Sequence, residues 1–247
     1  MNNVKAIFKK QFKGSVKNPE TLIQFMIYPV MAFVMGFVTN FDFSDYGLPQ
    51  EMLDAMMANM PNMVTMMACM FAGMALIPAV AGIIAEDIER KSMRFLLMAG
   101  VKPTAYLIGV GSVIFLVSIL TSVVFSFIGG FSGLDFWIFT ASMLSGVVAS
   151  TAMGAIIGIL TKNQQSATAL SMPIAMVLGF GPMIAQFNET AARVLNIFYT
   201  QQLNVVANYL EFGGDTPLWQ SFAIMWANIL VLGISFVIVY RKKGLRE

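Results

Sequence analysis

Long uncharged apolar runs constrain the fold of this chain more than any other feature of its sequence. MMACMFAGMALIPAVAGIIA and YLIGVGSVIFLVSILTSVVFSFIGG, for example, contain no Asp, Glu, Lys or Arg. Apolar runs of about 18 residues or more are typical of membrane-spanning helices. Charged residues make up 11% of the chain, against about 25% in soluble domains. The sequence therefore predicts an integral membrane protein rather than a soluble domain with a very large core.

Six apolar segments are long enough to cross a bilayer as helices. A helix rises 1.5 Å per residue, so about 20 residues cross a hydrocarbon layer of about 30 Å. Prolines inside these segments are compatible with spans, because neighbouring helices satisfy the freed carbonyls. We predict an all-α integral membrane protein, a single six-span domain over residues 1–247, with spans at 21–39, 63–85, 104–128, 136–160, 166–185 and 218–240.

Basic residues gather in every second connecting segment. Segments 1–20, 86–103, 161–165 and 241–247 hold 14 of the 15 Lys and Arg residues, and Arg193 is the exception. Short loops rich in Lys and Arg stay on the cytoplasmic side of a membrane. We therefore expect a multi-pass protein of the plasma (inner) membrane, with both termini and segment 86–103 in the cytoplasm.

The first twenty residues show an amphipathic pattern. Val4, Ile7, Phe8 and Phe12 share one helical face, and lysines share the opposite face. This pattern predicts a helix in the cytoplasmic interface, with its lysines near anionic lipid headgroups. A solvated charged helix is the alternative.

Segment 86–103 interrupts the apolar chain with seven of its 28 charged residues. It contains two acid-before-base pairs four residues apart, Glu86 with Arg90 and Asp87 with Lys91. Such pairs favour an exposed helix. Apolar residues follow, and Gly100 with Pro103 beyond it is typical of a helix end. The predicted short cytoplasmic helix has an apolar end that either dips into the bilayer interface or fills a groove on a soluble partner.

Four stretches together resemble the ABC type-2 permease family. EDIERKSMRFLLMAGVKPTAYLIG is similar to the family's cytoplasmic loop after the second span, and VKNPETLIQFMIYPVMAFVMGF to its first span. GILTKNQQSATALSMPIAMVLGFGPM resembles its junction between the fourth and fifth spans, and the basic tail also fits. The chain departs from the family's usual pattern at Lys91 and Ser92, where Gly-Thr is common, and at Arg94, where an acid is common.

The resemblance implies a permease subunit of an ATP-driven exporter that works by alternating access. Two permease subunits, identical or related, would pair with two separate P-loop ATPase subunits. ATP and Mg²⁺ would bind to the ATPases and no cofactor to this chain, which contains no G-x-x-x-x-G-K-[ST] pattern. We expect membrane lipids as further partners, and we expect the chain to bind no nucleic acid.

The resemblance also assigns roles to particular segments. Segment 86–103 would be a coupling helix seated in a cleft of the ATPase, and segment 186–217 would form short helices that dip into the outer leaflet. The expected coupling residues are Glu86, Asp87, Glu89, Arg90, Ser92 and Phe95, with Asn18 and Pro19 at a secondary contact.

Methionines form one stripe that runs into the second predicted span. The chain has 21 methionines, and the spacing of those in the stripe alternates between four and three residues: Met56, Met60, Met63, Met67, Met70 and Met74. Thioethers bind Cu(I), but methionine is also an adaptable packing residue used on promiscuous surfaces. Packing, a surface for an amphiphilic substrate and a copper site all remain open, although the chain has no histidine and one cysteine.

Small residues recur every fourth position in the fourth predicted span, at Ser142, Gly146, Ser150, Gly154 and Gly158. Such a stripe lets two helix backbones approach closely. It indicates either packing within the chain or a seam between two permease subunits.

The predicted spans lack the groups that other membrane activities need. Ion-coupled transporters use an ionisable group inside the membrane, and no Asp, Glu, Lys or Arg lies inside these six segments. Membrane-embedded enzymes need paired acids or a nucleophile with a base. A membrane scaffold or sensor that docks a cytoplasmic partner is the alternative function. The methionine-rich, charge-poor spans favour transport of a peptide, lipid or drug-like amphiphile over a long polysaccharide.

Overall fold

The computed structural model describes residues 7–9, 12, 19–39, 63–92, 98, 100, 103–213 and 217–244, and no β-strand occurs among them. The predicted all-helical fold is therefore confirmed over this part of the chain. The helices are α2 (Pro19–Thr39), α4 (Met63–Met70), η2 (Phe71–Ala75), α5 (Leu76–Glu89), α7 (Pro103–Ile128), α8 (Gly133–Leu160), α9 (Gln164–Phe187), α10 (Glu189–Leu195), α11 (Tyr199–Phe212) and α12 (Leu218–Gly244).

Five helical stretches in the described part are long and apolar enough to cross a membrane: Met63–Glu89, Ile108–Ile128, Gly133–Leu160, Gln164–Phe187 and Leu218–Lys242. They confirm a multi-pass membrane protein. The first predicted span falls on α2, whose apolar stretch Ile23–Val34 is shorter. The second predicted span is α4, η2 and α5 in one continuous run, which continues to Glu89 rather than ending at residue 85.

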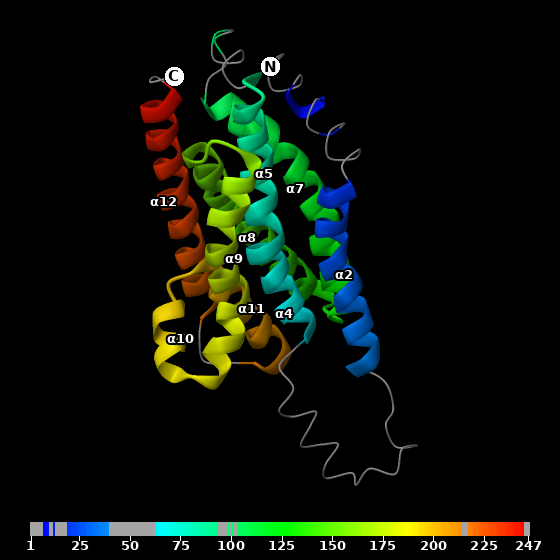
Figure 1. Cartoon of the computed structure of the whole chain (residues 1–247). Helices are drawn as coiled ribbons and strands as arrows, with labels where there is room; N and C mark the ends of the chain where they lie inside the picture. Colours follow the sequence, from blue (N-terminus) through cyan, green and yellow to red (C-terminus); the bar gives the residue numbers. More distant parts are fainter. Residues whose placement is uncertain are drawn as a thin grey trace.

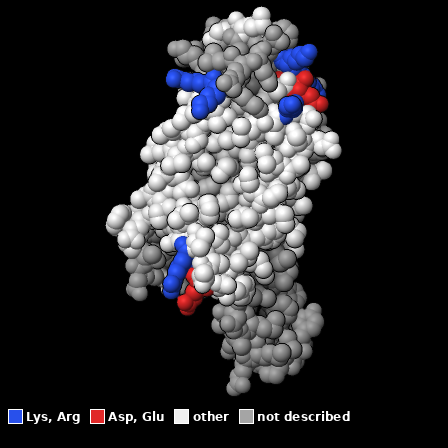
Figure 2. All heavy atoms as spheres, turned by 60° about the vertical axis from the view of Figure 1, so that its left-hand side comes forward, with Lys and Arg blue, Asp and Glu red and all other residues white. Residues whose placement is uncertain are grey.

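The helices form an elongated bundle, shown in Figure 1. The start of α2, the end of α5 and the end of α12 lie at one end of the bundle, which we call the terminal end. The short helices α10 and α11, in the predicted segment 186–217, lie at the opposite end. Figure 2 shows charged side chains at both ends and an uncharged band between them on the face in view. This distribution suits a bundle that crosses a membrane along its length.

The core forms where α8 packs against α5, α7, α11 and α12. Phe71 of η2 is fully buried and packs against the ring of Phe25 on α2 and that of Phe125 on α7, with centroid distances of 6.0 and 5.9 Å. By contrast, α12 buries little of its apolar surface within the chain. Its exposed side chains, such as Leu230 and Ile234, are suited to contact with lipid.

A few residues of the predicted N-terminal helix are described. Residues 7–9 are helical, and the rings of Phe8 and Phe12 stack with centroids 5.8 Å apart. Ile7 is buried against Gly109 of α7, whereas Lys9 is exposed. The rest of segment 1–18, including Asn18, lies outside the described residues.

Candidate functional site

The charged segment at the terminal end begins as the last turn of α5. Glu86 to Glu89 belong to α5, so they do not start a separate helix as the sequence predicted. The helix continues because no glycine or proline lies between Ala85 and Glu89 to end it. The side chains of Glu86 and Arg90 are 2.9 Å apart, which confirms the predicted pair. With 74% of the Arg90 side chain exposed, the pair contributes little stability.

The helix ends in a left-handed turn. The amide of Arg90 donates to the carbonyl of Glu86, and that of Lys91 to the carbonyl of Ile88, both at 2.9 Å. Lys91 has a φ of 55°, the left-handed conformation in which glycine is common at helix C-termini. Lys91 therefore leaves the helical face that it was predicted to share with Asp87.

Asp87 points into the protein rather than outward. Asp87 is 4% exposed, whereas the sequence predicted it on an exposed docking surface. Its carboxylate accepts hydrogen bonds from the Ser92 hydroxyl at 2.8 Å and from the Tyr106 hydroxyl at 2.9 Å. Buried carboxylates require such partners. Asp87 and Ser92 thus hold the turn together and tie it to the start of α7.

Glu89 forms a second tie, to the start of α9. Its Oε2 accepts a hydrogen bond from the backbone amide of Gln164 at 3.2 Å. Asn163 caps α9 by accepting from the amide of Ser166, and the Ser166 hydroxyl completes a reciprocal capping box. A carboxylate at a helix N-terminus is favoured by the helix dipole. Glu89 therefore joins the end of the second span to the start of the fifth predicted span.

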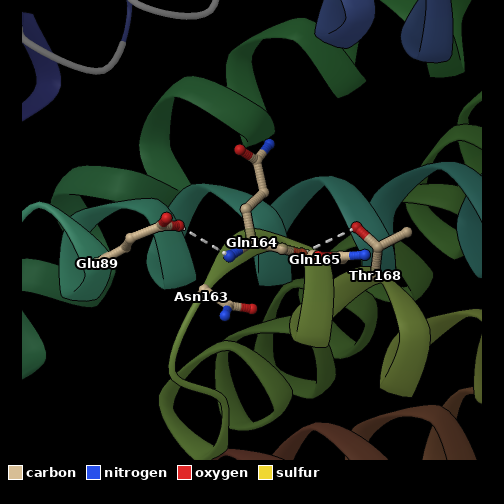
Figure 3. A pocket seen from close by; sticks show the side chains of 5 residues that line it. All are labelled: Glu89, Asn163, Gln164, Gln165 and Thr168. Atoms are coloured by element: carbon tan, nitrogen blue, oxygen red, sulfur yellow. Dashed lines mark hydrogen bonds between the residues drawn. The ribbon is translucent and has the colours of Figure 1, made fainter.

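A polar hollow of about 430 Å³ opens beside this contact, lined by Glu89, Asn163, Gln164, Gln165 and Thr168. Figure 3 shows the Glu89 carboxylate directed at the backbone nitrogen of Gln164, with the Asn163 and Gln164 side chains on opposite sides of that contact. Of these lining residues, the sequence predicted only Glu89 as a site residue. The acid-rich segment gave the signal for Glu89, whereas no local pattern predicts a contact across 75 residues.

The remaining predicted coupling residues are only partly described. Phe95 and Asn18 lie outside the described residues, and Pro19 is the first residue of α2. Met98 is 77% exposed, and Gly100 adopts a φ of 74°, as suits the predicted helix end. The predicted coupling helix as a whole remains a prediction.

The methionine stripe runs along α4 and η2. Met63, Met67, Met70 and Met74 are all half-buried, and Met56 and Met60 lie outside the described residues. Met74 lies against Gly179 of α9, so this end of the stripe packs within the chain. Among the described residues, no cluster of three or more His, Cys, Asp or Glu side chains could hold a metal ion.

The small-residue stripe of α8 packs within the chain against η2 and α5. Ser150 donates to the carbonyl of Ala72 at 2.6 Å, and its Oγ lies 2.9 Å from the Tyr199 hydroxyl. A Cβ on Gly154 would lie 2.6 Å from the carbonyl oxygen of Ile77, and one on Gly158 would lie 2.8 Å from that of Ala81. Gly146 faces Ala72 and Tyr199, and Ser142 donates to the carbonyl of Phe139. These positions are buried between helices of one chain.

The π-helix η2 was not predicted. The amide of Leu76 donates to the carbonyl of Phe71, five residues back, which inserts a π-turn into the second span. Single π-turns within α-helices often occur at functional sites. Gly73 of η2 meets Gly179 of α9 so closely that a Cβ on Gly73 would lie 2.5 Å from the Gly179 backbone nitrogen. Two glycines in apolar segments were the only sequence signal for this contact.

Comparison with known families gives a match over most of the chain. Residues 39–240 match the family described as ABC-2 family transporter protein. The match spans the described helices from α4 to α11 and nearly all of α12. No curated protein matches the chain.

Proposed function

Because the chain belongs to the ABC-2 family of transporters, whose members are membrane transport subunits, we propose that it is the permease subunit of an ATP-driven exporter. The first predicted span, on α2, completes a six-span bundle in this proposal. The terminal end of the bundle faces the cytoplasm, because the basic segments of the sequence gather there. Segment 186–217, with α10 and α11, then faces outward.

The energy comes from a separate chain. Two P-loop ATPase subunits bind ATP and Mg²⁺, since this sequence has no pattern of its own to hold ATP phosphates. A second permease subunit, identical or related, completes the translocation path. Closing of the ATPase pair pushes on segment 86–103, and the permease halves tilt between inward and outward states.

The observation that carries this proposal is the hydrogen bonding of Asp87 and Glu89, at the start of segment 86–103. Asp87 is tied to Tyr106 on α7, and Glu89 to Gln164 on α9. A displacement of the segment therefore moves the cytoplasmic ends of three helices together. In this arrangement Glu86, Glu89 and Arg90 present charge to the ATPase, while Asp87 and Ser92 hold the turn. Phe95 is the expected apolar anchor of the interface.

The proposed substrate is amphiphilic: a peptide, a lipid or a drug-like molecule. Met63 and Met67 on α4 are half-buried, and thioether side chains adapt to varied apolar shapes. Changing Met60, Met63 and Met67 to glutamate should abolish export without preventing assembly, and changing them to leucine should preserve it. Unchanged export by the glutamate variant would contradict a substrate surface at these residues.

A pull-down from native membranes tests the assignment. The tagged chain, solubilised in mild detergent, should capture a P-loop ATPase in stoichiometric amount, identified by mass spectrometry. A variant with Glu86, Arg90 and Phe95 changed to alanine should lose the ATPase while eluting normally on size exclusion. Absence of an ATPase under several mild conditions would contradict the exporter. Capture of a partner without a P-loop would favour the alternative, a non-transporting scaffold or sensor.

A further inference from the structure

The second span changes its neighbours at the π-helix η2. Figure 1 shows α4 and α5 as one continuous run, yet the two parts pack differently. On the outer side of η2, α4 packs mainly against α2, α9 and α11. On the cytoplasmic side, α5 packs mainly against α8 and α9. η2 therefore separates two parts of one span that belong to different parts of the bundle.

α8 holds the cytoplasmic part of the span and η2 itself. Ser150 of α8 donates to the carbonyl of Ala72 in η2 at 2.6 Å. Gly154 and Gly158 lie so close to α5 that added Cβ atoms would approach carbonyl oxygens of α5 at 2.6 and 2.8 Å. α8 is a continuous helix of 28 residues that contains no proline. Backbone contacts this close tie α5 to a stiff neighbour.

The backbone of the span is interrupted at η2 and again just beyond it. The amide of Leu76 donates five residues back, to the carbonyl of Phe71. Pro78, three residues beyond the end of η2, has no amide hydrogen to donate. Helices bend at π-turns and at prolines, because the ladder of backbone hydrogen bonds is broken there. A bend at this point moves α4 without separating α5 from α8.

α9 meets η2 through backbone alone. A Cβ on Gly73 would lie 2.5 Å from the backbone nitrogen of Gly179, so neither residue places a side chain between the two helices. The two backbones can therefore turn against each other without a change of rotamer. Pro182, three residues after Gly179, also lacks an amide hydrogen. α9 is thus able to bend beside the same contact.

We propose that η2 is a joint in the second span: α4 swings about η2 together with α2, while α5 stays on α8, and this swing opens the outer end of the permease. The inference rests on the proposed function, which supplies the displacement at segment 86–103. Phe25 and Tyr28 of α2 both pack against the ring of Phe71, the first residue of η2. α2 is therefore attached to the joint as well as to α4.

Distances between pairs of spin labels, measured by electron paramagnetic resonance, test the joint. The sample is the full chain with its ATPase in lipid nanodiscs, and both pairs use α8 as the reference in a Cys69→Ala background. The outer pair is Met63→Cys at the start of α4 with Leu134→Cys at the start of α8. The cytoplasmic pair is Lys91→Cys, just beyond α5, with Leu160→Cys at the end of α8.

The two distances are compared between the nucleotide-free complex and the complex trapped with ATP and vanadate. The outer distance should change by about 4 Å, the displacement at the end of an eight-residue helix, about 12 Å long, that tilts by about 20°. The cytoplasmic distance should not change, because α5 stays on α8.

The contact with α9 is tested by Gly179→Ala. The added methyl group would meet the flexible side chain of Met74, with Cγ at 2.5 Å, so the protein should fold with this side chain wedged between η2 and α9. The change in the outer distance should then be lost. Gly181→Ala is the matched control, because its methyl group would meet Leu195 of α10 instead of η2. It should keep the change, and the melting temperatures of both variants check that they fold.

The outcomes separate this inference from the proposed function. If both distances change alike on trapping, the second span moves as one rigid rod, so the joint is wrong and the permease stands. A trapped complex in which neither distance changes would also overturn the joint. A full change in folded Gly179→Ala would show that η2 does not turn against α9. If no ATPase copurifies with the chain, so that nothing can be trapped, the proposed function falls and this inference falls with it.

Discussion

The hydroxyl of Tyr106 donates a hydrogen bond to the carboxylate of Asp87 across 2.9 Å, and both residues are buried. Asp87 lies in the last turn of α5 and Tyr106 in the first turns of α7. A hydrogen bond between buried groups therefore joins the end of α5 directly to the start of α7. Such a bond is worth more than an exposed ion pair, because leaving a buried carboxylate short of a partner is costly.

Replacing Tyr106 with phenylalanine should lower the free energy of unfolding by about 1.5–3 kcal/mol, since hydrogen bonds to charged groups fall in that range. The melting temperature of the detergent-solubilised protein measures the effect. Tyr209→Phe is the control, because no partner for its hydroxyl lies among the described residues. Equal melting temperatures for both variants would show that the Asp87–Tyr106 bond contributes no stability.

Replacing Ser150 with alanine should destabilise the bundle by about 0.6–1.7 kcal/mol, the range for hydrogen bonds between membrane helices. Ser150 donates to the carbonyl of Ala72, which lies in the π-turn of a neighbouring helix. Ser145→Ala is the matched control, because Ser145 donates within α8, to the carbonyl of Ala141. The melting temperature of Ser150→Ala should fall below that of Ser145→Ala, and the reverse order would refute the role of Ser150.

Replacing Gly73 with alanine should cost about 1–3 kcal/mol, the usual effect of overpacking. The added Cβ would lie 2.5 Å from one backbone atom of Gly179 and 2.7 Å from another, and backbone cannot turn aside as a side chain does. Gly233→Ala on α12 is the control, since nothing lies within 4 Å of its Cβ position. Thermal unfolding should separate the two variants, and an unaffected Gly73→Ala would mean that η2 and α9 can move apart freely.

How far the sequence predicted this structure depends on the range of the interactions involved. The length of an apolar run and the charge of a loop are properties of single segments, so the sequence predicted the bounds of the long helices to within a few residues. It also predicted the Glu86–Arg90 pair, which depends on spacing within one helix. The second span was wrongly predicted to end at residue 85, because the charged residues begin there, whereas the backbone continues as a helix to Glu89.

Contacts between distant segments were beyond the sequence. That Asp87 turns inward depends on Tyr106 reaching it from the next helix. That Glu89 accepts a hydrogen bond from the first amide of α9 depends on how two spans pack. The π-turn of η2 leaves no periodic trace in a segment that is apolar on every side. The candidate site could thus be located at segment 86–103, but its division into inward and outward acids could not be predicted.

Replacing Lys91 with glycine should stabilise the protein by about 1 kcal/mol, because a non-glycine residue in the left-handed region is strained by that order. Lys91 has a φ of 55° at the end of α5. Lys91→Ala removes the charge but keeps the Cβ, so it is the control for the lost lysine. Glycine should raise the melting temperature above both wild type and alanine. An equal rise with alanine would trace the effect to charge instead of backbone strain.

Single-cysteine labelling should show that the ends of the bundle face opposite sides of the membrane. Cys69 is the chain's one cysteine and is fully buried, so the wild type should resist a membrane-impermeant maleimide. In a Cys69→Ala background, Arg193→Cys on α10 should react in intact cells, because segment 186–217 faces outward in the proposed topology. Lys162→Cys, between α8 and α9, should react only after the membrane is opened. The reverse pattern would invert the topology and place segment 86–103 where no cytoplasmic ATPase could reach it.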